Sequence, residues 1–168
     1  MRTAKLFVIF ALVALLAACG FQLRGNYALP FATLSISLPP TSAFYAQLKR
    51  SIEAASPTRI VGEAKDAEAS LIVLGDTQQK QILSLTAAGR AREYGLVRTF
   101  TFKVSGTNGA EYVPPSQIVL RRDITYSDDL VLSKESEEAL LWRDIQNDLV
   151  QQIMRRLAAA KLKAADES

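Results

Sequence analysis

The chain has 168 residues, 49% of them hydrophobic and 22% charged, so we expect one globular domain with a sizeable core. It contains one cysteine and no histidine, which excludes a Ser-His-Asp triad, a histidine-rich zinc site, an internal disulfide and a multi-cysteine metal site. The 20 basic residues against 17 acidic ones give a net charge of +3, too weak to indicate a nucleic-acid binder.

The N-terminal segment has the pattern of a secretory signal. A basic start is followed by an apolar run over residues 6–18, which suits a signal peptide and is too short to span a bilayer comfortably. The run ends before Cys19, and residues 16–19, Leu-Ala-Ala-Cys, match the lipobox of bacterial lipoproteins. We therefore expect a signal peptide over 1–18 and a single domain over 19–168. The alternatives are a cleaved signal with an incidental cysteine and an uncleaved anchor helix.

Cys19 would carry an N-acyl group and an S-diacylglycerol group, and we expect no other cofactor. Each buried CH₂ of an acyl chain contributes about 0.8 kcal/mol, so several chains on one cysteine should anchor the protein permanently. Lipoproteins that stay in the inner membrane usually have Asp after the cysteine. Gly20 therefore favours the outer membrane, by resemblance to this class.

The first elements of the mature chain are predicted to be a strand and a helix. Residues 32–38 alternate apolar and polar side chains, which is typical of a half-buried strand, and Pro39 ends it. Thr41 or Ser42 can cap the helix that follows, and Pro57 ends it. One helical face is apolar, with Phe44, Leu48 and Ile52 recurring every four residues.

A long β region follows the first helix. Apolar runs and period-two alternation, rich in aromatic and β-branched residues, predict three strands that form an antiparallel meander. Glycine-containing turns at 86–89 and 106–109 connect them, and Pro114 and Pro115 interrupt the return. The predicted strands are residues 70–85, 90–105 and 116–126.

The C-terminal segment has the clearest helical pattern. Ser133 is a candidate cap, acidic residues follow it, and basic residues lie near the end, as the helix dipole favours. The element order is therefore β-α-β-β-β-α. This order predicts an α+β two-layer sandwich, with both helices on one face of a four-stranded, mostly antiparallel sheet. The strand order stays open. The apolar stripe of the last helix comprises Trp142, Ile145, Leu149, Ile153 and Leu157.

Three segments resemble one known family. The mature start at 19–24 reads Cys-Gly-Phe-Gln-Leu-Arg, and the segment 89–94 is similar to the motif Gly-x-x-x-Glu-Tyr. Arg121 and Arg122 in the last strand are followed by Tyr126 and an Asp pair. In this order the segments resemble the lipopolysaccharide-assembly lipoproteins of the LptE family, which are partners of the outer-membrane β-barrel LptD.

The resemblance implies a protein that is anchored in the outer membrane and faces the periplasm. Family members lie as a plug in the lumen of LptD, assist its assembly, bind lipopolysaccharide and help insert it into the outer leaflet. Lipopolysaccharide carries phosphates, which Arg and Lys side chains bind well. Candidates are Arg90 and Arg92 beside the hairpin turn, and Lys134, at a position that is often basic in the family. Ala87 and Ala88 depart from the family, which can have a basic residue there.

Arg121 and Arg122 are further cations of the last strand. All these cations have an alternative interpretation as solvated charges or as partners of nearby acids. Aromatic residues of the long strands could form an acyl-chain surface. However, they lie on the same face of the predicted strand, which favours a core position against the helices. These aromatic residues are Tyr94, Phe100 and Phe102.

No catalytic constellation is present in the sequence, so we do not expect an enzyme. Cys19 is consumed by lipid, and there is no glycine-rich phosphate loop. The expected partners are lipopolysaccharide, the LptD barrel and the outer membrane, with no nucleic acid. Two alternatives stay open: a general periplasmic scaffold lipoprotein that binds only a protein, and an envelope hydrolase.

Overall fold

The computed structural model describes residues 28–107, 109–126 and 131–160. The predicted signal segment 1–18 and the predicted lipidation site Cys19 lie outside these residues, as does Asn108 of the second predicted turn. The elements are β1 (Thr33–Ile36), α2 (Ala43–Ala55), β2 (Arg59–Val61), a short 3-10 helix η1 (Ala64–Asp66), β3 (Ala69–Leu85), β4 (Ala91–Gly106), β5 (Glu111–Thr125) and α3 (Val131–Ala158).

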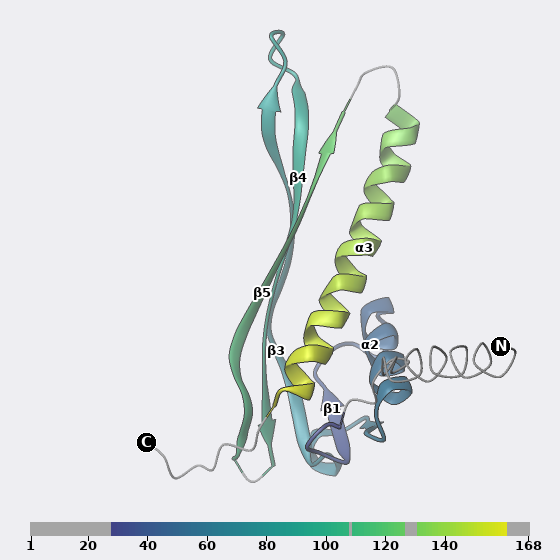
Figure 1. The fold of residues 1–168 in the computed structure, drawn as a ribbon, viewed down its shortest axis with the longest axis vertical. Coiled ribbons are helices and arrows are strands. Elements are labelled where there is room, and N and C mark those ends of the chain that lie inside the picture. The colour runs from purple at the N-terminus through teal and green to yellow at the C-terminus, as the bar shows by residue number, and fades with distance from the viewer. Residues whose placement is uncertain (1–27, 108, 127–130, 161–168) are drawn as a thin grey trace, which may run out of the picture.

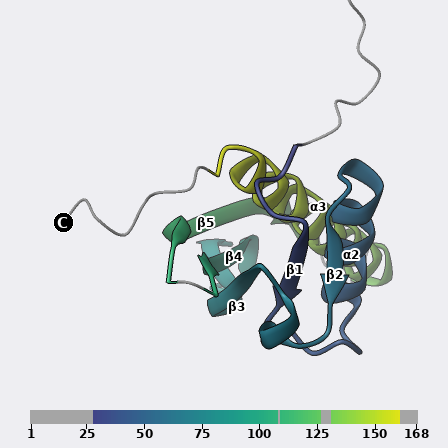
Figure 2. The same ribbon diagram turned by 90° about the horizontal axis from the view of Figure 1, so that it is seen from below.

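The strands form one mixed sheet in the order β2-β1-β3-β4-β5. The three long strands make the predicted antiparallel meander, whereas β1 runs parallel to both of its neighbours. Both helices lie on the same side of this sheet (Figure 2). The predicted α+β class with two layers is therefore confirmed.

The sheet has five strands rather than the predicted four. The additional strand, β2, contains three residues, which is too short to show period-two alternation. It pairs in parallel with β1, placing Thr33 beside Arg59 and Ser35 beside Val61. Helix α2 supplies the crossover connection that parallel neighbours require. β2 can be recognised only from its pairing with β1, which is distant from it in the sequence.

The proline pair does not interrupt the last strand, contrary to the sequence prediction. β5 begins at Glu111 and contains both Pro114 and Pro115. The pairing with β4 shifts register between Phe102 and Val104, and the prolines occupy this irregular stretch. A proline is tolerated at a bulge of an edge strand because its missing N–H has no ladder partner to lose.

The core lies between the sheet and the two helices. Phe100 and Phe102 of β4 are fully buried, so their assignment to the core is confirmed. Phe44 of α2 meets Phe100 edge-on at a ring-centroid distance of 5.5 Å. Tyr94 and Trp142 are partly buried and pack against the core. The predicted apolar faces are also confirmed, with Leu48, Ile52, Ile145, Leu149, Ile153 and Leu157 each at 0% exposure.

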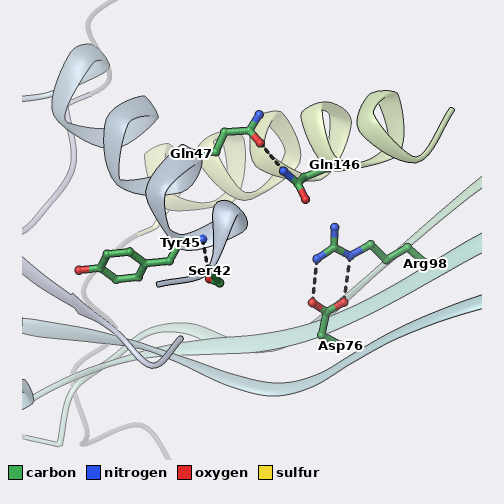
Figure 3. Close-up of polar contacts among 6 residues, drawn as sticks. All are labelled: Ser42, Tyr45, Gln47, Asp76, Arg98 and Gln146. Atoms are coloured by element: carbon green, nitrogen blue, oxygen red, sulfur yellow. Dashed lines mark hydrogen bonds and ion pairs between the residues drawn. The ribbon is translucent and has the colours of Figure 1, made fainter. Parts of the chain in front are cut away.

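Polar contacts fix the position of α2. The Ser42 Oγ accepts a hydrogen bond of 3.1 Å from the Tyr45 N–H, so Ser42 rather than Thr41 is the N-cap (Figure 3). Side-chain amides join α2 to α3, since the Gln146 Nε2 donates to the Gln47 Oε1 at 2.6 Å (Figure 3).

The molecule is elongated along β3, β4, β5 and α3, and the tip of the β3–β4 hairpin extends past the start of α3 (Figure 1). β1, β2 and α2 lie at the opposite end. β1 pairs with β3 only between Ala69 and Leu71. Beyond this point β3 is an edge strand of the described sheet, and its side chains are mostly exposed.

Candidate functional site

Arg90 and Arg92 lie on the hairpin tip, by which we mean residues 82–92. The Thr86 N–H donates to the Arg90 carbonyl oxygen at 2.7 Å, and the Gly89 N–H donates to the Thr86 carbonyl oxygen at 2.9 Å. Gly89 has a φ of 76°, a left-handed conformation that glycine adopts without steric cost. Both arginines are exposed. The hairpin between β3 and β4 has its tip at the end of the molecule farthest from β1 and α2 (Figure 1).

Lys134 lies in the first turns of α3. Its Nζ forms an ion pair of 2.7 Å with the Glu137 Oε2, and its side chain is 19% exposed. This contact agrees with the alternative that Lys134 is paired with a nearby acid. The ion pair is at a surface where Glu137 is 47% exposed, so an anionic ligand could compete for the ammonium group.

A polar cluster ties the hairpin to α3 near these cations. The Lys80 Nζ lies 2.6 Å from the Glu138 Oε2 and 3.1 Å from the Tyr126 Oη. The Tyr126 hydroxyl donates to the same Glu138 oxygen at 2.6 Å. The ammonium group also lies over the Tyr94 and Tyr126 rings, at 4.4 and 4.6 Å from their centroids. These four residues, the Lys80 cluster, join β3, β4, the end of β5 and α3.

The Lys80 cluster stabilises opposite charges on Lys80 and Glu138. Partial burial alone would raise the pKa of Glu138, but hydrogen bonds from Lys80 and Tyr126 outweigh it and hold this pKa below its ordinary value. Burial would likewise lower the pKa of Lys80, but its bonds to Glu138 and Tyr126 raise it. Burial, followed by the bond to Glu138, raises the pKa of Tyr126. The ion pair therefore persists at neutral pH.

The same cluster brings Arg92 and Lys134 to one end of the molecule. The Tyr126 N–H donates to the Arg92 carbonyl oxygen at 2.8 Å, and the Tyr126 hydroxyl binds Glu138. Glu138 lies about one helical turn after Lys134. The three predicted cations Arg90, Arg92 and Lys134 thus share the hairpin end, where their positive charges could bind phosphate groups.

The other two candidate arginines have acidic partners. Arg121 pairs with Asp123 on an exposed face of β5, with a distance of 2.8 Å from the arginine Nε to the Asp123 Oδ1. Arg122 forms an ion pair with Asp148, which connects β5 to α3. These pairs are consistent with structural roles, and neither arginine belongs to the hairpin tip.

A partly buried ion pair between β3 and β4 was not predicted from the sequence. Arg98 binds both oxygens of Asp76, at 2.9 and 2.7 Å (Figure 3). Its guanidinium also lies 4.6 Å from the Phe44 ring centroid. The Arg98 side chain is 3% exposed. The sequence contained one indication of this pair: Arg98 lies on the same face of its strand as the core residues Phe100 and Phe102. The Lys80 cluster had a similar signal, since Glu138 precedes Trp142 of the apolar stripe by four residues.

Neither a metal site nor a membrane-spanning helix is present among the described residues. No group of three or more His, Cys, Asp or Glu residues could hold a metal ion in the part of the chain that the structure describes. Within the same residues, no helix has the length and apolar character needed to cross a membrane.

Comparisons with known proteins agree on one family. The model of the LptE family, described as lipopolysaccharide-assembly, matches residues 31–157. The chain is 29% identical to the LPS-assembly lipoprotein LptE of Pectobacterium atrosepticum, over 86% of this chain and 79% of that protein. It is also 29% identical to the LPS-assembly lipoprotein LptE of Yersinia enterocolitica, over 100% of this chain and 84% of that protein.

Solved structures of lipoproteins share the fold. Lipoprotein B from Nitrosomonas europaea, solved by NMR in solution, is 33% identical with a TM-score of 0.71, covering 83% of this chain and 91% of that one. The crystal structure of a minor lipoprotein from Acinetobacter baumannii is 27% identical with a TM-score of 0.64, covering 83% of this chain and 99% of that one. Together with the family match across the whole sheet and both helices, these likenesses show that the chain belongs to the LptE lipopolysaccharide-assembly family.

Proposed function

We propose that this protein is an outer-membrane lipoprotein, anchored through Cys19 after removal of residues 1–18. It faces the periplasm, lies as a plug in the lumen of the β-barrel LptD, aids the assembly of that barrel, and binds lipopolysaccharide for insertion into the outer leaflet. The observation that carries the proposal is the family match over residues 31–157, which spans both helices and the sheet.

The hairpin end supports the lipopolysaccharide-binding part of the proposal. Arg90 and Arg92 are exposed, and the Lys80 cluster ties their hairpin to Glu138 of α3, about one helical turn after Lys134. Arginine can bind two phosphate oxygens at once, and lysine adds a compact charge. Because the net charge of the whole chain is only +3, phosphate binding depends on this local clustering.

The binding proposal is tested by reversing these charges. The triple variant R90D/R92D/K134D of the soluble domain should bind lipopolysaccharide roughly 10- to 100-fold more weakly than the wild type, because three attractive contacts with phosphate become repulsive. Binding is measured by titration at low and at physiological ionic strength. Circular dichroism and denaturant unfolding of each variant confirm that it is folded.

A matched control changes the same total charge at the other end of the molecule. Arg50, Arg59 and Arg155 are exposed residues of α2, β2 and the end of α3. The variant R50D/R59D/R155D should lose much less affinity than the hairpin variant. Equal losses in both variants would mean that only the net charge matters, and unchanged affinity in the hairpin variant would reject the proposed site.

The anchor is tested separately. Cells that express the wild-type chain should incorporate labelled palmitate into it, and the Cys19→Ala variant should not, because the thiol that takes the lipid is missing. Labelling of the variant at the wild-type level would contradict lipidation at Cys19.

A further inference from the structure

Large apolar side chains are exposed on the hairpin tip. Ile82 is 59% exposed, Leu85 is 57% exposed and Leu83 is 37% exposed. Core packing does not account for them, because α3 begins short of the tip (Figure 1). A cluster of exposed apolar side chains at one place on a soluble domain indicates an interaction site.

The apolar side chains occupy both faces of the hairpin. Ile82 pairs with Tyr94, whose ring contacts Tyr126 on the helix side of the sheet. Leu83 lies over the other face, since its Cδ2 is 3.2 Å from the position that a Cβ on Gly95 would take. A surface that docks flat on a partner needs apolar groups on one face only. Apolar groups on both faces favour a tip that is surrounded by its ligand.

The tip is also cationic. The segment 81–92 contains Arg90 and Arg92 and no acidic residue. The next residue, Glu93, accepts a hydrogen bond of 2.7 Å from the Ser84 hydroxyl, which holds its carboxylate beside the strand. Positive charge next to exposed apolar surface is complementary to an amphiphile that carries both phosphate and acyl chains.

We propose that the hairpin tip binds a phosphorylated acyl lipid through both of its parts. Arg90 and Arg92 contact the phosphate, while Ile82, Leu83 and Leu85 contact the acyl chains. This inference rests on the proposed lipopolysaccharide binding and deepens it, because it assigns an acyl-chain contact that is separate from the phosphate contact. The core aromatic residues Phe100 and Phe102 cannot take this role because both are fully buried.

The test uses two probes and three proteins. The probes are lipid A and its fully deacylated saccharide, which keeps the phosphates and lacks the acyl chains. The proteins are the wild-type domain, the tip variant I82S/L85S, and the control variant L74S/L140S. Leu74 and Leu140 are 50% and 53% exposed and lie outside the tip, so the control removes similar apolar area elsewhere.

The wild type and the control should bind lipid A more tightly than the saccharide. The tip variant should bind lipid A roughly 10- to 30-fold more weakly than the wild type, as expected for the loss of two half-exposed apolar contacts. It should bind the saccharide as the wild type does, because its arginines are intact. Circular dichroism and denaturant unfolding check that the folded domain is retained.

The possible failures are distinguishable. If the wild type binds neither probe, the proposed lipopolysaccharide binding itself fails. If it binds both probes equally, or if the tip variant keeps wild-type affinity for lipid A, the acyl contact is overturned and phosphate binding stands. A tip variant that binds lipid A normally but no longer copurifies with a barrel would show that the apolar tip contacts protein, which also overturns the inference.

Discussion

Arg98 shows how one buried charge is accommodated in this fold. Its guanidinium is bound at two points by Asp76 and lies over the Phe44 ring, so its charge is paired and one of its faces is covered. The pair joins β3 to β4 at the level where α2 covers the sheet (Figure 3). Removing one partner of such a pair leaves the other partly buried without compensation.

We therefore expect Arg98→Ala to lower the free energy of unfolding by about 2–4 kcal/mol. The matched control is Arg121→Ala, which breaks an ion pair whose partners are 51% and 59% exposed and should cost less than about 1 kcal/mol. Denaturant unfolding measures both. Equal effects in the two variants would contradict the structural role of the Arg98 pair.

The Lys80 cluster predicts a specific dependence of stability on pH. Because the pKa of Glu138 is lower in the folded state, its contribution is present above the ordinary value of 4.5 and is lost as the pH falls through the folded pKa. Because the pKa of Lys80 is raised, its contribution is present below 10.5 and is lost as the pH rises above that value. Between these limits the contribution is constant.

Glu138→Gln removes the charge and should lower the free energy of unfolding by about 1 kcal/mol at neutral pH, discounted for solvent screening. The difference from the wild type should shrink as the pH falls below the ordinary pKa of Glu138. Glu135→Gln, an exposed change on the same helix, is the control and should show neither effect. A Glu138→Gln difference that stays the same in acid would reject the assigned role of the carboxylate.

At the scale of elements, the structure decides which of two residues, Thr41 or Ser42, is the N-cap of α2. Only Ser42 accepts the Tyr45 N–H, so Ser42→Ala should cost about 1 kcal/mol of stability. Thr41→Ala should leave the free energy of unfolding nearly unchanged. Thermal or denaturant unfolding of the two variants compares them directly, and a larger effect at Thr41 would contradict the cap.

Elements with strong periodicity could be predicted from the sequence, and elements that depend on distant partners could not. The apolar faces around Leu48 and Leu149 follow the helical repeat and are buried as expected. By contrast, the short β2 exists through its pairing with β1, which no local pattern encodes. Pro114 is predicted to break the last strand, but the order of the whole sheet puts β5 at an edge, where a proline is tolerated.

The candidate site was only partly predictable for the same reason. Arg90, Arg92 and Lys134 came from a resemblance to a family, and the structure places them at one end of the molecule. The Lys80 cluster joins residues that are up to 58 positions apart, so the sequence does not show that they meet. The exposure of Ile82 depends on where α3 begins relative to the hairpin, which is likewise a property of the folded chain.

At the scale of the whole molecule, the two ends differ in what they expose. β1, β2 and α2 lie at one end and the β3–β4 hairpin tip lies at the other (Figure 1). The first end is packed around the core, whereas the hairpin end combines exposed cations with exposed apolar side chains. This difference between the two ends suits a protein whose lipid contacts are concentrated at one end. The face of the sheet opposite the helices stays uncovered in the described structure, with Val119 at 56% exposure, and is available to a surrounding partner.

The central claim is that the protein works as a lipid-anchored plug in a barrel. Its most direct test is to purify the tagged full-length chain from detergent-solubilised outer membranes and to identify what copurifies by mass spectrometry, with an unrelated tagged outer-membrane lipoprotein as the control. We predict recovery of a large outer-membrane β-barrel protein of the LptD type with this chain and not with the control. Recovery of the chain without any barrel partner would contradict the claim.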